Sequence, residues 1–333
     1  MKNIFIVGIE SIENTYDELS IYMNSIMNGI HEDVQYYILS KTQKESDKDY
    51  IFLYKQHKND FQVIYNYINE KQLDHCYIYI FKTHSFFQTD KYLQLLKEKN
   101  CQIINHVYKE KNKNIIENKI NKYSNHTICN NKILYQKIKE NYTNMMYLPY
   151  GIKEKINKEL PDELQIDDYY LVYGNNNIEL ILKEYLKAQT KRKLLILSNL
   201  KDDKRFHILD SKYPIKNNNQ IVVYDLKDYT LLPMIASKAF AYILGSENKI
   251  LCPYLLDILA YCKLNILKNT EYNQKIGEDS CIYFNLENNS LSQIIKHVEG
   301  FNQSYIEELG NKINQKIKEN YTYQDFIEAY MSL

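Results

Sequence analysis

Short apolar runs alternate with longer amphipathic segments along this chain, and this alternation limits the folds open to it more than any other feature. An apolar run bounded by polar residues is typical of a buried strand, and apolar residues at every third or fourth position are typical of a helix. Strands without a polar face indicate a parallel sheet that helices cover on both sides. The strands predicted in the first half are Asn3–Val7, Val34–Leu39, Ile51–Tyr54, Cys76–Phe81, Gln102–His106, Thr127–Cys129 and Met145–Leu148.

The alternation stops once and then resumes. The segment Lys153–Asp168 is charged, contains Pro161 and has no apolar run, so we interpret it as an interdomain linker. The length of 333 residues also favours two domains, because a single core rarely grows to this size. We therefore expect an α/β protein with two Rossmann-like domains, residues 1–152 and 169–320, joined by the linker 153–168. The strands predicted after the linker are Tyr169–Tyr173, Lys193–Leu197, Gln220–Tyr224, Phe240–Leu244, Leu264–Leu267 and Cys281–Phe284.

The charges and the cysteines exclude several classes of protein. Lys and Arg together number 42, as do Asp and Glu, so there is no basic field for binding nucleic acid. The six cysteines form no Cys-x-x-Cys pair, which favours reduced, buried thiols over disulfides or zinc ligands. The chain starts with an apolar strand and has no apolar run near the ~18 residues that a membrane span needs. We therefore expect a cytoplasmic protein without a leader sequence.

One segment, Ala241–Cys262, combines a strand, a polar loop and the start of a helix. The strand ends at Gly245, the loop carries a single acid, Glu247, and Pro253 begins a helix that contains Asp257. Such a unit can bind an anion, because free backbone N–H groups and the helix dipole point at the loop. Taken alone, the two acids also fit an ordinary surface loop and a helix whose dipole favours an acid near its start.

The residue order in this segment resembles the retaining family-4-type glycosyltransferases, most closely the bacterial rhamnosyltransferases of capsule and exopolysaccharide synthesis. That family typically shows Gly-x-Glu-x-Gly-Gly-Thr-Asn-Pro-x-Leu-Leu-Glu-Ala-Leu-Ala, and this chain has GSENKILCPYLLDILA from Gly245 onward. The spacing from Glu247 to Asp257 is the same in both. The segment Tyr272–Tyr283 resembles the family's aromatic-Asn-Arg-Glu-Val-x-Glu-Asp-x-Ala-x-Tyr.

The resemblance implies a GT-B fold, in which two Rossmann-like domains face a cleft and a C-terminal helix, here 321–333, returns to the first domain. The first domain would bind the acceptor and the second the nucleotide sugar. The implied reaction moves a hexose or deoxyhexose from a nucleotide-diphosphate sugar to a glycan or polyprenyl-diphosphate-linked acceptor in cell-surface polysaccharide synthesis, without a metal or other cofactor. A protein partner or a homo-oligomer is compatible with this class. The basic run Lys109–Lys122 could contact the inner face of the membrane, or could be a solvated lysine face.

The resemblance also implies roles for individual residues. Retaining transfer needs positive charge at the leaving diphosphate and polar groups around the sugar. Glu247 would be the catalytic residue that contacts the donor sugar, and Asp257 would accept hydrogen bonds from the ribose. The further donor-binding residues implied are Lys204 or Lys201 at the phosphates, Gly174, Asn273 and Glu278. The lysines could equally form a solvated face.

The chain also departs from the family's pattern. Asp17 and Glu18 stand where the family has two glycines that let the backbone approach the donor, and carboxylates there repel a diphosphate. Gly174 is followed by Asn175 rather than by the family's arginine. These departures support an alternative, a catalytically degenerate GT-B domain that acts as a partner or acceptor-binding subunit of an active glycosyltransferase. His106, at the end of a predicted strand, is a weaker acceptor-site candidate, because a single histidine there is more often structural.

Overall fold

The computed structural model describes residues 1–9, 12–45, 50–56, 58–83, 87–108, 115–142, 144–156, 158–174, 177–199, 205–246, 252–287 and 290–333. Contacts among these residues divide the chain into two compact units. Unit 1 comprises Met1–Tyr150 and Gln324–Leu333, and unit 2 comprises Gly151–Tyr323. Each unit contains one sheet, and every strand pair in both sheets is parallel. The predicted α/β class with two Rossmann-like domains is therefore confirmed.

The sheet of unit 1 has the strand order β3-β2-β1-β4-β5-β6-β7. Its strands are β1 (Lys2–Val7), β2 (Val34–Ser40), β3 (Tyr50–Tyr54), β4 (Cys76–Ile80), β5 (Gln102–His106), β6 (His126–Cys129) and β7 (Met145–Tyr147). Its helices are α1 (Glu18–Gly29), α2 (Asp60–Lys71), α3 (Thr89–Glu98), α4 (Ile115–Tyr123), α5 (Lys132–Ile138) and α13 (Tyr323–Met331). The predicted strands in this half all form, with differences of at most one residue at their ends.

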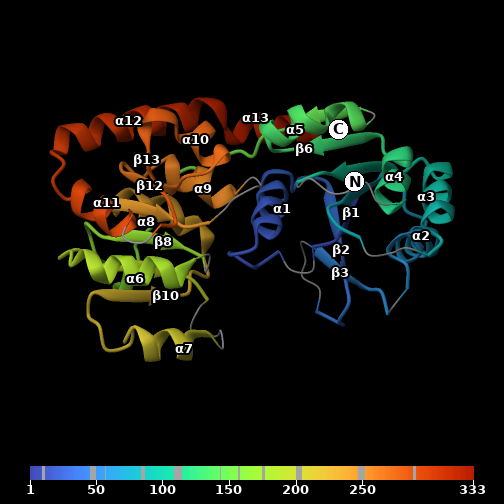
Figure 1. Cartoon of the computed structure of the whole chain (residues 1–333). Coiled ribbons are helices and arrows are strands. Elements are labelled where there is room, and N and C mark those ends of the chain that lie inside the picture. Colours follow the sequence, from blue (N-terminus) through green and yellow to red (C-terminus); the bar gives the residue numbers. More distant parts are fainter. Residues whose placement is uncertain are drawn as a thin grey trace. The chain divides into compact units, whose positions relative to one another are not determined.

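Helices cover both faces of this sheet, as the apolar strands require (Figure 1). Alternate residues of a strand point to opposite faces, so Phe5 and Val7 pack with α2, α3 and α4 in one core cluster. The other face carries α1, on the opposite side of the strands in Figure 1. Burial on both faces explains why the strands read as continuous apolar runs rather than as alternating ones.

Aromatic side chains hold the C-terminal helix α13 on unit 1. The hydroxyl groups of Tyr22 on α1 and Tyr330 on α13 are 2.6 Å apart, and Phe326 meets Tyr22 edge-on. His106 lies in the same cluster, stacked on Phe81 with ring centroids 4.0 Å apart, and is 3% exposed. Burial lowers the pKa of His106 to about 3, so the ring is neutral and packs as an aromatic side chain. This placement supports the structural interpretation of His106.

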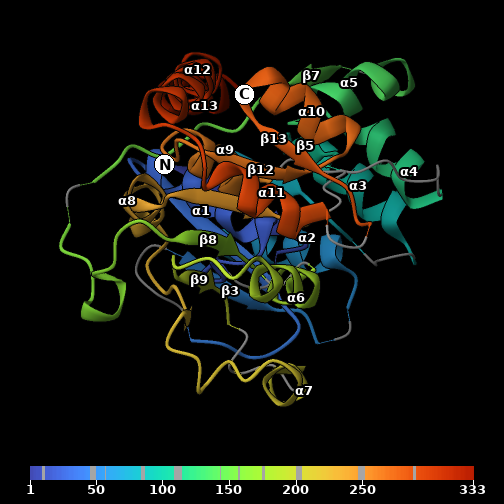
Figure 2. The same cartoon turned by 60° about the vertical axis from the view of Figure 1, so that its left-hand side comes forward.

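The sheet of unit 2 has the strand order β10-β9-β8-β11-β12-β13. Its strands are β8 (Tyr170–Tyr173), β9 (Leu194–Leu197), β10 (Ile221–Tyr224), β11 (Ala241–Leu244), β12 (Asn265–Lys268) and β13 (Ile282–Phe284). Its helices are α6 (Ile178–Ala188), α7 (Arg205–Lys212), α8 (Leu232–Lys238), α9 (Pro253–Leu259), α10 (Glu271–Gly277), α11 (Ser290–Val298) and α12 (Gln303–Asn320). Figure 2 brings this unit forward, with α6 and α11 on the near side of the sheet, where both join its main core cluster.

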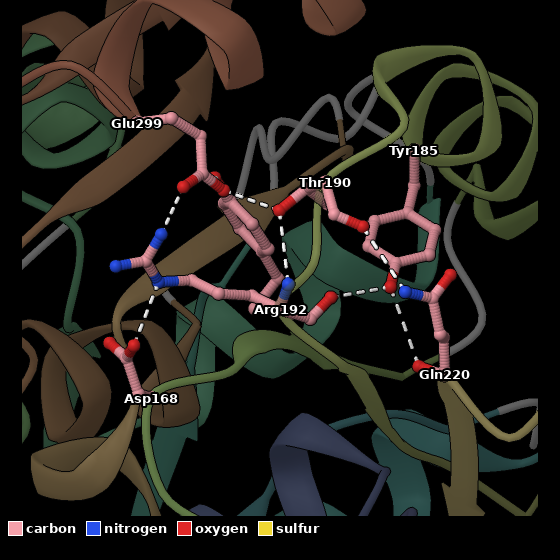
Figure 3. Close-up of polar contacts among 7 residues, drawn as sticks. Asp168, Tyr185, Thr190, Arg192, Gln220 and Glu299 are labelled. Atoms are coloured by element: carbon pink, nitrogen blue, oxygen red, sulfur yellow. Dashed lines mark hydrogen bonds and ion pairs between the residues drawn. The ribbon is translucent and has the colours of Figure 1, made fainter.

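Polar side chains join the amino ends of the strands in unit 2 (Figure 3). Arg192 Nε lies 3.0 Å from Asp168 Oδ2, and the same guanidinium pairs with Glu299. Glu299, just after α11, also accepts hydrogen bonds from the hydroxyl groups of Tyr170, at 2.9 Å, and Thr190. The cluster ties α11 to the starts of β8 and β9. It lies at the edge opposite to the carboxyl ends of the strands, where ligands bind in such sheets, so we interpret it as structural.

A helix that crosses a bilayer needs about 20 predominantly apolar residues, and the helices of the described part fall short of this. None of them is both long enough and apolar enough to cross a membrane.

Candidate functional site

The sheet of unit 2 reverses its strand order between β8 and β11, which are neighbours although two strands separate them in the chain. Open parallel sheets bind ligands outside the carboxyl ends of the strands at such a point. Gly174 directly follows β8 here, with a left-handed backbone (φ +78°). A Cβ atom built on Gly174 would meet no described atom within 4 Å. The predicted site residue Gly174 therefore lies at the reversal point beside open space.

The loop after β8 leads into α6, whose first turn no described side chain caps. Asn177, the residue before the helix, has a left-handed backbone (φ 54°), and its side-chain amide donates to the carbonyl of Gly245 after β11. Asn177 thus connects the two loops at the reversal point. Free N–H groups and the dipole at the start of α6 favour an anion.

A buried hydroxyl group lies at the same edge of the sheet. Ser246 follows Gly245 and is 4% exposed, and its Oγ has no hydrogen-bond partner among the described residues. Leaving a buried polar group unpaired costs about 1–3 kcal/mol. A ligand that accepts or donates a hydrogen bond here would remove this cost.

Sequence reasoning missed Lys268, the last residue of β12. It lies one position beyond the Leu244–Leu267 register pair, at the level of Gly245. Lys268 is only 6% exposed, and a buried ammonium group needs polar or anionic surroundings. Its backbone carbonyl accepts a hydrogen bond from Asn273 Nδ2 at 2.7 Å, which holds the end of the strand. In the sequence, Lys268 is visible only as a lysine that directly ends an apolar run, and its burial is not.

Asp257 on α9 is completely buried, and both of its carboxylate oxygens accept hydrogen bonds within unit 2. Oδ1 accepts from the backbone N–H of Lys153 at 2.8 Å, and Oδ2 accepts from the Tyr229 hydroxyl at 2.7 Å. Burial lowers the pKa of Lys153, and the charge of Asp257 opposes that shift. With no exposed surface, Asp257 could meet a ribose only after a local rearrangement.

Two of the other predicted site residues, Asn273 and Glu278, lie in the described part of the chain. Asn273 is buried, and its Oδ1 has no hydrogen-bond partner in the described part of the chain. Glu278 directly follows α10 and pairs with Lys316 on α12 at 2.7 Å. The remaining residues, Glu247, Lys201 and Lys204, lie outside the described residues. Within the described ranges, no group of three or more His, Cys, Asp or Glu side chains is placed to hold a metal ion.

Unit 1 has its own reversal point, between the neighbouring strands β1 and β4. A cavity of about 470 Å³ opens there at the carboxyl ends of the strands, and Asp17, Lys82 and Tyr108 line it. Gly8, at the end of β1, has a left-handed backbone (φ +97°). A Cβ on Gly8 would lie 2.1 Å from the carbonyl oxygen of Lys82, so only glycine allows β1 and β4 to approach here.

The wall of this cavity at the start of α1 is acidic. Asp17 caps the helix, because its Oδ2 accepts from the backbone N–H of Ser20 at 2.8 Å and from the Ser20 hydroxyl at 2.6 Å. Burial raises the pKa of Tyr108, and the charges of Asp17, Glu117 and Glu18 raise it further. A side chain therefore satisfies the Ser20 N–H, one of the groups at this helix start that a diphosphate would use. The negative charges disfavour an anion in this cavity.

The whole chain was compared with known proteins. No family model matches the sequence, and no curated protein sequence is significantly similar to it. Solved structures do match along the full length. Sucrose-phosphate synthase from Thermosynechococcus elongatus aligns with a TM-score of 0.73 at 11% identity, covering 100% of this chain and 98% of that one.

Two other solved structures align in the same way. HepE of Anabaena, in complex with UDP-glucose, gives a TM-score of 0.72 at 9% identity and covers 100% of both chains. The α,α-trehalose 6-phosphate synthase of Burkholderia multivorans gives 0.62 at 8% identity, covering 100% of this chain and 98% of the other. At such low identity the likeness shows the fold alone. The chain therefore has a GT-B fold built from two Rossmann-like domains.

Proposed function

We propose that this chain is a glycosyltransferase that moves a hexose or deoxyhexose from a nucleotide-diphosphate sugar to a glycan or lipid-linked acceptor in cell-surface polysaccharide synthesis. The observation that supports this most is the polar edge of unit 2 at the carboxyl ends of its strands. The start of α6 and the hydroxyl of Ser246, neither of which has a side-chain partner among the described residues, lie there on neighbouring strands together with the buried Lys268. The GT-B fold and a structural neighbour bound to UDP-glucose add to this support.

The proposed chemistry assigns a separate task to each group. As the bond between the sugar and the diphosphate breaks, negative charge develops on the leaving phosphate oxygens, and preorganised positive groups stabilise it. The N–H groups at the start of α6 and the ammonium of Lys268 would supply that charge, in place of the arginine that this chain lacks after Gly174. Glu247 would contact the transferring sugar, as the family resemblance implies. Retention of configuration and transfer without a metal are part of this proposal.

A binding experiment tests the proposal directly. Calorimetric titration of the full chain with UDP, UDP-glucose and the corresponding dTDP compounds should show binding at micromolar to millimolar concentration. Lys268→Gln should weaken that binding by about tenfold or more, because a charge-assisted contact to phosphate is worth about 1.5–3 kcal/mol. Lys275→Gln is the matched control, because Lys275 lies on α10 with a 52% exposed side chain that pairs only with its helix neighbour Glu271 in the described part. Absence of any nucleotide binding by the unchanged protein would refute the proposal.

One observation favours a second candidate. Asp257 is engaged inside unit 2 and the start of α1 is capped by Asp17, so two positions that contact the donor in the resembled family are occupied by internal contacts. A catalytically degenerate GT-B domain, acting as a partner or acceptor-binding subunit of an active transferase, would tolerate both changes. This candidate predicts no nucleotide-sugar binding, together with retention of a glycan or a protein partner by the folded chain.

A further inference from the structure

Two cysteines of unit 1 occupy equivalent positions on neighbouring parallel strands. Cys76 is the first residue of β4, and Cys101 directly precedes β5. Because Tyr77 pairs with Gln102 in the register of these strands, the residues one position earlier, Cys76 and Cys101, lie side by side. Both side chains belong to the core cluster on the α2–α4 face of the sheet. The strand pairing therefore brings two thiols together that are far apart in the sequence.

The separation of the strands suits a covalent bond between the two sulfur atoms. Neighbouring strands lie ~4.7–4.9 Å apart, and disulfides join residues whose Cα atoms are ~4.4–6.8 Å apart. The residues before the two cysteines, His75 and Asn100, both have left-handed backbones (φ 51° and 59°). The two strands thus begin with similar turns, which keeps the cysteines level with each other.

The two thiols are chemically unequal. The Cys76 thiol lies 3.8 Å from the carbonyl oxygen of Leu73 and 3.7 Å from that of Asp74, to which it can donate. The neighbouring Cys101 thiol, followed by burial, raises the pKa of Cys76. The neighbouring Cys76 lowers the pKa of Cys101, with Lys99 and Lys97 adding to the effect against burial. One sulfur of the pair is thus the better nucleophile, and the other is a protonated neighbour held beside it, which is the arrangement of reactive dithiols.

We propose that Cys76 and Cys101 form a redox-active dithiol that closes to a disulfide between β4 and β5 on reaction with an oxidised low-molecular-weight thiol. In the first step the Cys101 thiolate attacks the disulfide of the small molecule, forms a mixed disulfide and releases one small thiolate. In the second step Cys76 loses its proton, attacks Cys101 Sγ and releases the second small thiol. The protein loses two hydrogen atoms, and the small disulfide becomes two thiols. The site is independent of the proposed transferase reaction, because the two cysteines lie in unit 1 at the amino ends of its strands, whereas the groups assigned to the donor phosphates lie in unit 2.

The sulfur atoms are buried but close to the surface. Cys76 and Cys101 are 4% and 2% exposed, and each follows two exposed residues, Asp74 and His75 in one case and Lys99 and Asn100 in the other. Only the start of a strand must open locally for a small disulfide to reach them. Local opening at strand ends needs far less free energy than global unfolding.

The first experiment uses the native full-length chain. It is equilibrated with mixtures of reduced and oxidised glutathione, quenched with acid, alkylated and digested with trypsin. The expected product is a disulfide between the peptides Gln72–Lys82 and Asn100–Lys109, formed while the other four cysteines remain alkylated. If these two peptides stay separate at every glutathione ratio, or if all six thiols oxidise together, the proposal fails.

The second experiment separates the roles of the two sulfur atoms. In Cys76→Ser, Cys101 should stop at the mixed disulfide with glutathione, whereas in Cys101→Ser, Cys76 should remain reduced. Cys129→Ser is the matched control, because Cys129 is a fully buried thiol of the same unit and its loss should leave the linked peptides unchanged. Equal glutathione addition in both single variants would contradict the assigned roles. If a variant fails to fold, the peptide-linkage experiment on the unchanged chain still tests the proposal.

Alkylation rates compare the reactivity of Cys101 with that of Cys129, a second buried thiol of unit 1. Burial raises the pKa of Cys129 to about 11, and the pKa of Cys101 lies below its ordinary value of 9.0. At pH 8 Cys101 therefore carries more thiolate than Cys129, and the lower nucleophilicity of a less basic thiolate offsets only part of this difference. We therefore expect Cys101 to react with iodoacetamide faster than Cys129 in the native chain. A rate equal to or below that of Cys129 would overturn the proposal.

Discussion

Replacing Asp257 by alanine should destabilise unit 2 far more than the loss of a surface ligand contact would. The substitution leaves two buried donors without an acceptor, the backbone N–H of Lys153 and the hydroxyl of Tyr229, which now lie 2.8 and 2.7 Å from the carboxylate. Each unpaired buried group costs about 1–3 kcal/mol, so the free energy of unfolding should fall by about 2–6 kcal/mol. That is a large part of the 5–15 kcal/mol that is typical of a domain.

Two related substitutions test the reasoning step by step. Asp257→Asn keeps the shape, and its carbonyl oxygen can still accept from the Lys153 N–H while its amide faces the Tyr229 oxygen, so we expect a loss of about 1–3 kcal/mol. Tyr229→Phe removes a single donor and should also cost less than the alanine variant. Asp257→Ala should therefore lower the free energy of unfolding more than either of the other two variants does.

The assay is amide hydrogen exchange by mass spectrometry along a urea series. Peptides that cover α9 report on unit 2, and peptides that cover β1 and β4 report on unit 1 in the same sample. Protection of unit 1 should be unchanged and serves as the internal reference. If Asp257→Ala lowers the stability of unit 2 by less than about 1 kcal/mol, the two hydrogen bonds do not carry the energy assigned to them, and a role for Asp257 confined to the ribose becomes the better account.

Two further predictions concern unit 1. The pKa of His106 is lowered from 6.5 to about 3 by burial, so between these pH values the unfolded chain binds more protons, and stability should fall as the pH drops through 6.5. The slope approaches ~1.4 kcal/mol per pH unit below pH 6.5, and because half of the unfolded histidine is already protonated at pH 6.5, the loss between pH 6.5 and pH 4.5 is about 2.3 kcal/mol. Exchange of β5 and α13 peptides in His106→Phe should lack this component, and a variant with the same pH dependence as the original chain would contradict the assignment. Gly8→Ala places a Cβ 2.1 Å from the Lys82 carbonyl oxygen in a left-handed backbone. The free energy of unfolding of unit 1 should therefore fall by about 3 kcal/mol or more, while that of unit 2 stays the same. A change below about 1 kcal/mol in the same assay would show that the backbone can relax.

The sequence and the structure agree most closely on the elements themselves. The strand Gln102–His106 was expected with these bounds, and Pro253 was expected to begin a helix, as it does in α9. Such elements depend on the spacing of apolar residues along a few turns or a single strand, which is visible without the fold.

The candidate site was harder to predict, because its residues come together through strand order. Asp257 was singled out as a ribose ligand, but its contacts with Lys153 and Tyr229 span 104 and 28 residues of the chain. Lys268 was overlooked, since its significance depends on burial beside the loop after β11. No local pattern reports that burial. Glu247, Lys201 and Lys204 lie outside the described residues, and their roles remain predictions.

By itself, the sequence determined that this chain forms parallel α/β sheets with helices on both faces, because runs that are apolar on every residue can be stable only where both faces are covered. It also determined that the cysteines are buried, since they lie within or beside those runs. Only the tertiary structure decided that Cys76 lies beside Cys101, that α13 packs on the tyrosines of unit 1, and that Lys268 ends its strand at the level of Gly245. The physical reason is that periodicity specifies which face of an element is buried, whereas the neighbour of each strand is chosen by the packing of the whole domain.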